Sequence, residues 1–233
     1  MSQPAGASLN TIPLFAEIGD AERDRLSQLC SWRRYGPQEQ IIDRDAETSD
    51  VYFIAEGRVR IVIYSLSGRE IAFDELVEGQ YFGELAGIDR GRRSASVVAL
   101  RPTLVAAMNA ATFMDTVCNN ASCAKPLLQH LARMVRRATD RIMDLSTLGA
   151  NNRVHAEILR LARDTLQPDN TATIKPIPVH SDIAARVSTA RETVARVFGQ
   201  LAQAGIVERR SDHLLVHDFD RLEEMVEEVR GDF

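Results

Sequence analysis

The chain of 233 residues contains few cysteines and no long apolar run. Cys30, Cys118 and Cys123 show no C-x-x-C spacing, so the sequence indicates a reducing compartment and no disulfide framework. Cys118 and Cys123 are close enough for a metal or redox role, although free thiols are the more common outcome. No apolar run approaches the ~18 residues of a membrane-spanning helix, and the N-terminus lacks the basic and apolar regions of a signal peptide. We therefore expect a cytoplasmic protein that does not bind a membrane.

The composition is that of a globular chain with a small negative charge. Its length suits two modest domains or one large one, and its apolar content of 45% is enough for real cores. The net charge of −5 excludes a chain that is basic throughout. A local basic patch can still bind nucleic acid, so this function class stays open.

A glycine-rich stretch lies at residues 79–94. Glycines let a backbone approach a ligand closely, and a helical turn opening at Gly83 would aim N–H donors at an anion. Arg93 can bind a phosphate through two hydrogen bonds, Ser94 adds a hydroxyl donor, and Glu84 can accept from a sugar hydroxyl. A surface turn between strands is the alternative. The stretch predicts a pocket for a nucleotide with few phosphates, and because its side chains face a ligand we expect the fold to survive their removal.

The sequence around this stretch is strand-like from Trp32 to Met108. Short β-rich runs occur at residues 41–42, 51–54, 59–64, 71–73, 94–99 and 103–108. Many short strands with glycine turns predict a small barrel or roll.

Residues 125–148 follow a different pattern. Apolar residues spaced 3, 4, 3, 4 and 3 apart form a heptad stripe: Leu128, Leu131, Val135, Ala138, Ile142 and Leu145. Charged residues surround this narrow stripe, which favours a coiled-coil dimer over a helix packed on its own domain. We expect His130 to be a surface residue of this helix, and residues 149–152 to break it as a hinge.

Residues 180–201 predict a helix-turn-helix with its turn at residues 187–189. Arg191, Glu192 and Arg196 lie at the start of the second helix on its outward side, which is the part of a recognition helix that reaches base edges. Ser181 and Thr189 are further candidate DNA contacts. Alternatively, Thr189 and Glu192 form a capping box, and the two arginines are ordinary solvated residues.

The charge around this motif differs from that of the whole chain. Residues 180–210 contain five arginines and three acidic residues, a net charge of +2. Residues 206–210 and 214–216 predict a hairpin wing, and the acidic segment after residue 218 predicts a helix that does not face DNA.

Two sequences carry a family resemblance: FGELA at residues 82–86 followed by RSA at 93–95, and RETVAR at 191–196. The first resembles the phosphate-binding cassette of cyclic-nucleotide-binding domains. Together they resemble the cAMP receptor protein branch of the superfamily that includes the fumarate–nitrate regulator, over about residues 16–216. The resemblance implies an α+β chain: a cyclic-nucleotide-binding β-roll (12–124), a dimerisation helix (125–148) and a winged helix-turn-helix (149–233).

The resemblance also assigns roles to residues of the cassette. It implies that Glu84 binds the ribose 2′-hydroxyl of a cyclic nucleotide and that Arg93 and Ser94 bind its cyclic phosphate. Gly83 and Leu85 are implied to contribute backbone contacts.

The base of the nucleotide is implied to lie against the dimerisation helix. Thr139 aligns with a serine that reaches the purine, partly across the dimer. Ala138 replaces the threonine that usually precedes it, and Met134 replaces an arginine, so both cAMP and cGMP remain possible ligands.

On DNA, the resemblance implies a homodimer on a palindromic operator with half-sites like TGTGA. Arg191 would read a guanine, Glu192 a cytosine amino group, and Arg196 a second guanine. RNA polymerase is the further partner that such a regulator implies.

Two other functions compete with this interpretation, and neither fits the residues as well. An iron–sulfur sensor needs four cysteine ligands, and a haem sensor needs axial ligands, whereas no histidine lies between residues 51 and 94. A nucleotide-binding regulator of enzymes would not need the helix-turn-helix. Because no activated nucleophile or metal cluster accompanies Glu84 and Arg93, we expect no enzymatic activity.

Overall fold

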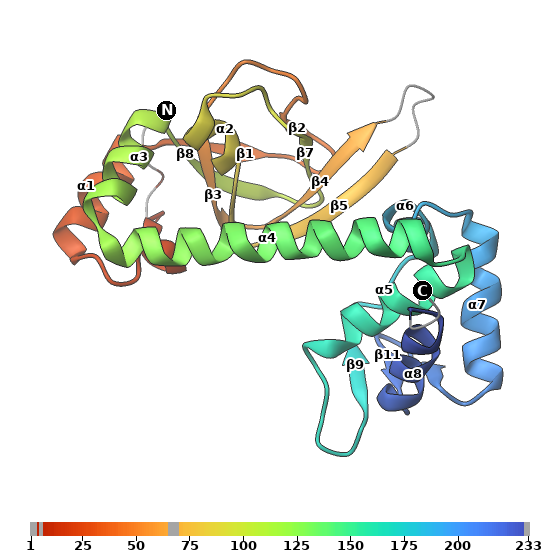
Figure 1. Cartoon of the computed structure of the whole chain (residues 1–233). Helices are drawn as coiled ribbons and strands as arrows, with labels where there is room; N and C mark the ends of the chain where they lie inside the picture. The colour runs from red at the N-terminus through yellow and green to blue at the C-terminus, as the bar shows by residue number, and fades with distance from the viewer. Residues whose placement is uncertain (1–3, 5–6, 65–69, 231–233) are drawn as a thin grey trace. The chain divides into compact units, whose positions relative to one another are not determined.

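The structure is a computed structural model that describes residue 4, residues 7–64 and residues 70–230, with the backbone alone for residues 70–73. The chain divides into two compact units, Met1–Met134 and Val135–Phe233 (Figure 1). The domains expected at residues 12–124 and 149–233 include residues 65–69 and 231–233, which lie outside the described part.

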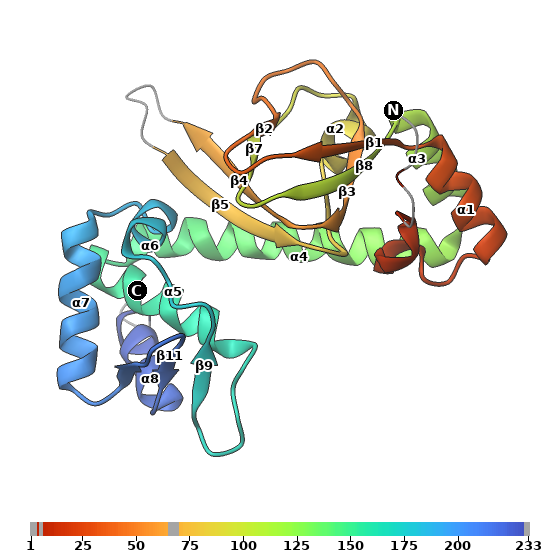
Figure 2. The ribbon, with the colours of Figure 1, turned by 180° about the vertical axis from the view of Figure 1, so that it is seen from behind.

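The first unit contains the predicted roll, made of two four-stranded antiparallel sheets (Figure 2). One sheet has the order β1-β8-β3-β6 and the other β2-β7-β4-β5. The strands are β1 (Ser31–Tyr35), β2 (Gln40–Ile42), β3 (Val51–Glu56), β4 (Arg58–Tyr64), β5 (Glu70–Val77), β6 (Tyr81–Phe82), β7 (Ser96–Ala99) and β8 (Thr103–Met108). Each predicted β-rich run lies in or overlaps one of these strands.

The register of the central strands places the apolar side chains inside the roll. Phe53 on β3 lies opposite Ala106 on β8, and both are buried. Phe53 also contacts the rings of Phe15 and Phe113, at centroid distances of 5.0 and 6.3 Å. This aromatic cluster fixes the helical segments at the N-terminus and after β8 onto the sheet.

Helical elements accompany the sheets. They are the 3-10 turns Leu9–Thr11 and Pro13–Phe15, and the helices α1 (Asp20–Leu29), α2 (Glu84–Asp89), α3 (Ala110–Asn119) and α4 (Ala121–Thr147). Helix α3 was not predicted, although Asn109 caps it by accepting from the Thr112 N–H at 2.9 Å.

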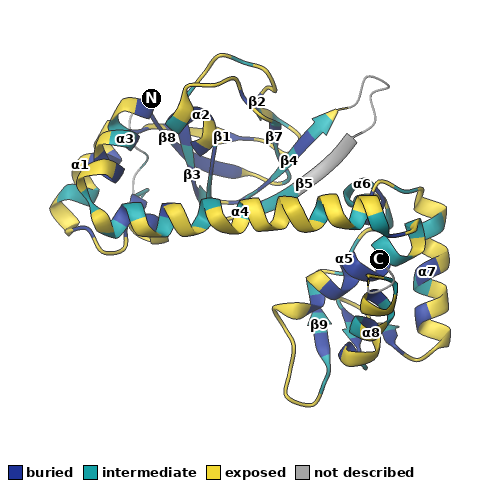
Figure 3. Cartoon of the chain, in the orientation of Figure 1, coloured by how far each residue is buried: buried dark blue, intermediate teal, exposed yellow. Residues whose placement is uncertain are grey.

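Helix α4 buries few of its residues and exposes most of the heptad stripe (Figure 3). Cys123 and Leu127 pack into the core of the first unit. Leu128, Val135 and Ile142 are 65%, 65% and 64% exposed. The described residues therefore leave these three side chains uncovered, which argues against a helix that packs its whole apolar side on its own domain.

Beyond the end of α4, the described part of the second unit combines helices α5 to α8 with a small sheet of order β10-β11-β9. Its elements are α5 (Ala150–Arg163), β9 (Ala172–Ile174), α6 (His180–Arg186), α7 (Arg191–Gln203), β10 (Val207–Arg209), β11 (Leu214–Val216) and α8 (Phe219–Arg230). These elements include the predicted helix-turn-helix and hairpin wing, and the acidic C-terminal segment forms helix α8.

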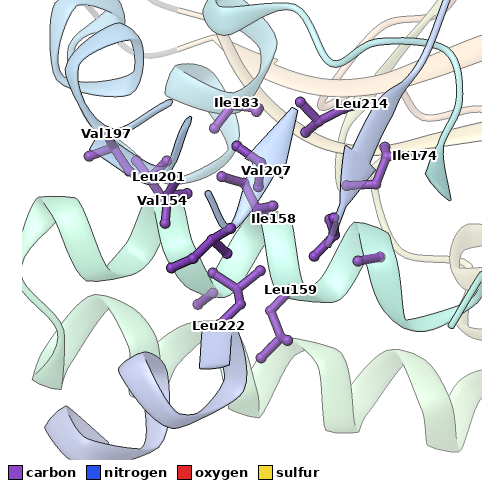
Figure 4. Packing of buried hydrophobic residues seen from close by; sticks show 14 of the residues in the cluster. Val154, Ile158, Leu159, Ile174, Ile183, Val197, Leu201, Val207, Leu214 and Leu222 are labelled. Carbon is purple, nitrogen blue, oxygen red and sulfur yellow. The ribbon is translucent and has the colours of Figure 1, made fainter. Parts of the chain in front are cut away.

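Side chains from all these elements meet in one core (Figure 4). Val154 and Ile158 of α5 lie at its centre with no exposed surface, and Ile183 of α6, Leu201 of α7 and Leu222 of α8 pack on it. Helix α8 is therefore part of the core rather than a solvated tail.

The expected hinge at residues 149–152 is partly wrong. Helix α4 ends at Thr147 and α5 begins at Ala150, so Leu148 and Gly149 form the break and Asn152 is already helical. Gly149 is the N-cap of α5 with an extended backbone, which lets the next helix start immediately. Among the described helices, none is long and apolar enough to cross a membrane.

Candidate ligand site and nucleic-acid interface

The glycine-rich stretch forms a strand, a tight turn and a short helix. Strand β6 ends at Phe82, Gly83 adopts a left-handed conformation with φ of +82°, and α2 begins at Glu84. A Cβ at Gly83 would lie 2.7 Å from Arg93 Nη1 and 3.0 Å from the carbonyl oxygen of Asp50. Both the conformation and the space therefore require glycine here. The predicted helical turn opening at Gly83 is confirmed.

The side chain of Arg93 is enclosed by protein and is only 2% exposed. Its Nε donates to Thr48 Oγ1 at 3.0 Å, Nη1 to the carbonyl of Gly83 at 3.0 Å, and Nη2 to the carbonyl of Asp50 at 2.8 Å. Burial lowers the pKa of Arg93, partly offset by the negative charges of nearby groups. A guanidinium has five N–H donors, so two remain for a ligand.

These contacts correct one expectation. Arg93 joins the segment before β3 to the cassette, and it does not simply face a ligand. Its removal would leave the Asp50 carbonyl without this donor, while the Gly83 carbonyl would keep the Gly87 N–H, so we expect this side chain to contribute to the stability of the fold as well.

Glu84 is also buried, at 4% exposure. Its Oε1 lies 3.8 Å from Nε2 of His130 on α4, and the rings of His130 and Tyr81 have centroids 5.0 Å apart. Burial and the charge of Glu84 raise the pKa of Tyr81. His130 was expected on the surface, but its side chain is only 21% exposed. His130 is therefore a neighbour of the candidate site that the sequence did not reveal.

The other predicted ligand residues are more open. Leu85 and Ser94 are exposed next to the buried pair. Thr139 belongs to the second unit, where its exposed side chain donates to the carbonyl of Val135 at 3.1 Å. The structure thus brings Gly83, Glu84 and Arg93 into one cluster. Among the described residues, no group of three His, Cys, Asp or Glu side chains could hold a metal ion.

In the second unit, α6 and α7 are joined by a turn whose carbonyl groups accept hydrogen bonds from Arg153 of α5. Arg153 donates from Nε to the Val187 carbonyl at 2.9 Å, from Nη1 to Leu148 at 2.8 Å and from Nη2 to Ser188 at 3.2 Å. Ser188 has a positive φ of 52°. One side chain therefore ties the break after α4 to the turn of the helix-turn-helix motif.

The predicted base-reading residues project from the first turns of α7. Arg191, Glu192 and Arg196 are all exposed. Arg196 Nη2 donates to Asn151 Oδ1 at 3.3 Å, whereas Arg191 and Glu192 have no hydrogen-bond or ion-pair partner within the described chain. The start of this helix therefore presents unpaired charges of both signs.

The capping-box alternative for this helix is wrong. The N-cap is Ala190, without a side-chain hydrogen bond, so Glu192 occupies the second helical position rather than the third. Thr189 lies one residue earlier and is partly exposed, and its backbone N–H donates to Ala184 at 3.0 Å. Ser181 is exposed on α6, with its hydroxyl 3.5 Å from Asp182.

A histidine that the sequence analysis did not single out lies beside this surface. The ring of His180 contacts that of Phe198, with centroids 4.9 Å apart. Burial, Arg209 and Arg191 all lower the pKa of His180. Arg191 of α7 and Arg209 of β10 therefore lie close enough to His180 to act on its imidazole.

Both units match known families. Residues 32–120 match the family model of the cyclic nucleotide-binding domain, and residues 152–225 match that of the Crp-like helix-turn-helix domain. Together they define a transcription regulator that combines a cyclic nucleotide-binding domain with a Crp-like helix-turn-helix domain.

Individual relatives agree with these matches. The cyclic AMP receptor protein of Thermus thermophilus is 32% identical over 91% of this chain and 96% of its own length. A CRP-like cAMP-activated global transcriptional regulator of Mycobacterium tuberculosis is 26% identical, covering 80% and 84%. The chain belongs to the cyclic AMP receptor protein family.

Solved structures share the fold. The Thermus thermophilus catabolite activator protein is 31% identical, with a TM-score of 0.53 over 93% of this chain and 99% of its own. A CooA mutant from Carboxydothermus hydrogenoformans has a TM-score of 0.80 at 20% identity, covering 93% and 96%. The second likeness concerns the fold alone.

Proposed function

We propose that this CRP-like transcription regulator binds cAMP or cGMP and in response binds a palindromic operator as a homodimer. One observation supports the proposal most strongly: Glu84 and Arg93 are both buried next to Gly83, whose carbonyl accepts from Arg93. These residues lie inside the part of the chain that matches the cyclic nucleotide-binding domain. A buried carboxylate beside a buried guanidinium suits a ligand with both a hydroxyl and a phosphate.

In this proposal each cassette residue has one role. Arg93 uses its two remaining N–H donors on the cyclic phosphate, and the exposed Ser94 adds its hydroxyl. Glu84 accepts from the ribose 2′-hydroxyl, while Gly83 and Leu85 offer backbone groups. The named relatives that are cAMP-activated regulators support cAMP as the first ligand to test.

For DNA, α7 is the proposed recognition helix. Arg191 reads a guanine with two hydrogen bonds, Glu192 accepts from a cytosine amino group, and Arg196 reads a second guanine of a TGTGA-like half-site. Their exposure and their place in the first turns of the helix support these roles. Ser181 and Thr189 contact the sugar–phosphate backbone.

The proposed dimer forms along α4, in the dimerisation helix of residues 125–148. The exposed apolar side chains of Leu128, Val135 and Ile142 support it, because a heptad stripe of this exposure needs a partner helix. Thr139 lies on this helix and reaches the base of the nucleotide, partly across the dimer. The proposed domains on either side are residues 12–124 and 149–233.

The proposed regulator acts in the cytoplasm, recruits or blocks RNA polymerase, and has no enzymatic activity. The named relatives that support this view are transcription regulators. Nothing in the cluster of Glu84 and Arg93 provides a nucleophile paired with a base.

Calorimetric titration with cAMP and cGMP side by side tests the ligand. We expect one or both to bind, and Glu84→Ala to lose at least about tenfold in affinity, because a charge-assisted hydrogen bond is worth roughly 1.5–3 kcal/mol. Fluorescence anisotropy on a labelled TGTGA palindrome then tests the response, with operator binding expected to tighten when the nucleotide is present.

An absorption spectrum of the purified protein serves as the control for the rival function. A redox or gas sensor on this scaffold would carry an iron–sulfur cluster or haem and be coloured. Failure of both nucleotides to produce heat, or a coloured protein that responds to redox state, would contradict the proposal.

A further inference from the structure

The buried carboxylate of Glu84 has a close titratable neighbour among the described residues, the imidazole of His130. His130 lies on α4 within the first unit, and its Nε2 is 3.8 Å from Glu84 Oε1. Both side chains are largely shielded from solvent, at 21% and 6% exposure. The contact is therefore made inside the site and not between two mobile surface groups.

Glu84 needs such a neighbour. Placing a carboxylate away from water is unfavourable unless another group compensates for the lost hydration. Within the described residues, no side chain or backbone N–H donates a hydrogen bond to Glu84, and His130 is the group within ion-pair distance. Arg93 influences Glu84 electrostatically, but three of its donors are directed at Thr48, Gly83 and Asp50.

His130 is itself held in place. Its ring contacts the ring of Tyr81 at 5.0 Å and an interplanar angle of 47°. Helix α4 is anchored here by Leu127, three residues earlier, which is buried in the core of the first unit. Tyr81 is only three residues before Glu84, across the turn at Gly83. The segment of residues 81–84 therefore positions both groups: Tyr81 contacts the imidazole, and Glu84 carries the carboxylate.

We propose that His130 positions the Glu84 carboxylate for the hydroxyl of the ligand's ribose. The proposal rests on the proposed function. The imidazole faces Oε1, which leaves Oε2 to accept from the 2′-hydroxyl. An acceptor that is already oriented loses less conformational freedom when the ligand arrives, so its hydrogen bond contributes more to affinity.

The test compares each cyclic nucleotide with its 2′-deoxy analogue. For wild type we expect the 2′-deoxy form to bind about tenfold more weakly, the effect of one charge-assisted hydrogen bond. His130→Ala should weaken binding of the ribose form by roughly threefold to tenfold and leave the 2′-deoxy form nearly unchanged, so the ratio of the two dissociation constants falls toward one. His130→Gln, which keeps a donor, should restore part of the ratio.

Gln129→Ala is the matched control, because Gln129 is the exposed neighbour on the same helix and should keep the wild-type ratio. A wild-type ratio in His130→Ala, or an equal loss for both nucleotides, overturns the positioning role, since a merely structural residue would change both affinities alike. If the alanine variant does not fold, His130→Leu, which keeps a bulky side chain without a donor, is measured in its place and decides in the same way.

Glu84→Ala separates this inference from the proposed function. If Glu84→Ala abolishes the ratio and His130→Ala does not, the inference is wrong and the ligand site stands. If Glu84→Ala keeps the wild-type ratio, or wild type binds neither nucleotide, the proposed ligand site itself is wrong.

Discussion

The two candidate sites treat their charged residues in opposite ways. In the cassette, Glu84 and Arg93 are 4% and 2% exposed, and protein groups surround them. On α7, Arg191 and Glu192 are exposed and have no partner within the described residues. A small ligand can be enclosed, so its site can be part of the protein interior, whereas a DNA duplex can only be met at a surface. Substitutions in the first site should therefore change stability and binding together, and those in the second should change binding alone.

The largest expected effect is that of Arg93→Ala. The change removes three hydrogen bonds and leaves the Asp50 carbonyl without this donor, which costs about 1–3 kcal/mol, whereas the Gly83 carbonyl still accepts from the Gly87 N–H. We expect a clear fall in the midpoint of thermal unfolding and at least about a tenfold loss in nucleotide affinity.

The neighbouring Arg92 provides the control. It is exposed and pairs with Glu47 at 3.0 Å, and a surface ion pair of this kind contributes little to stability. Equal unfolding midpoints for Arg93→Ala and Arg92→Ala would show that the hydrogen bonds of the buried Arg93 do not stabilise the fold.

Arg191→Ala should give the complementary result. The unfolding midpoint should stay that of wild type, because Arg191 has no partner to lose in the part of the chain that the structure describes. The free energy of operator binding should become less favourable by about 1–3 kcal/mol. The preference for the matched base should weaken at one base pair per half-site. Anisotropy on matched and mismatched operators measures both.

Gln200→Ala, an exposed change later on the same helix, should leave operator affinity unaltered. If Arg191→Ala retains the wild-type preference between matched and mismatched operators, Arg191 does not read a base.

The smallest expected effect concerns His155, an ionisable side chain that is buried in the second unit. His155 is 7% exposed, its Nδ1 has no hydrogen-bond partner among the described residues, and burial lowers its pKa from the ordinary 6.5. Below pH 6.5 the unfolded chain therefore binds a proton that the folded chain does not. The free energy of unfolding should fall as the pH drops through this range, by at most about 1.4 kcal/mol per pH unit.

His155→Leu should remove this component. Urea denaturation at pH 7.5 and pH 5.5 measures it as the difference between the two proteins at each pH. A parallel fall in wild type and variant would assign the acid sensitivity to other groups.

Much of the fold was predictable because local residue patterns indicate where its strands and helices lie. Alternating residues gave the strands around β4, and helical spacing with a central turn gave α6 and α7. Helix α3 was missed because the strand signal of β8 runs almost directly into it. The break between α4 and α5 was placed too late because asparagines are good turn residues, and Asn152 nevertheless fits within a helix once Gly149 has capped it.

The site was predictable in its residues but not in its surroundings. The order of Gly83, Glu84 and Arg93 gave the cassette. The buried Arg93 donates to the Thr48 hydroxyl and the Asp50 carbonyl, and no local pattern connects these residues to it. His130 lies 46 positions after Glu84, so only the folded chain brings the two together.

The clamp of Arg153 has a consequence for protein engineering. A chimera that fuses a foreign sensor to the start of α5 would keep this guanidinium but lose the Leu148 carbonyl that it binds. It would also lose Arg141, which donates to Arg186 at 2.5 Å, and Asp144, which pairs with Arg230 at 2.5 Å. A transplantable DNA-reading module should therefore begin before Arg141, inside α4 rather than at the apparent boundary between the helices.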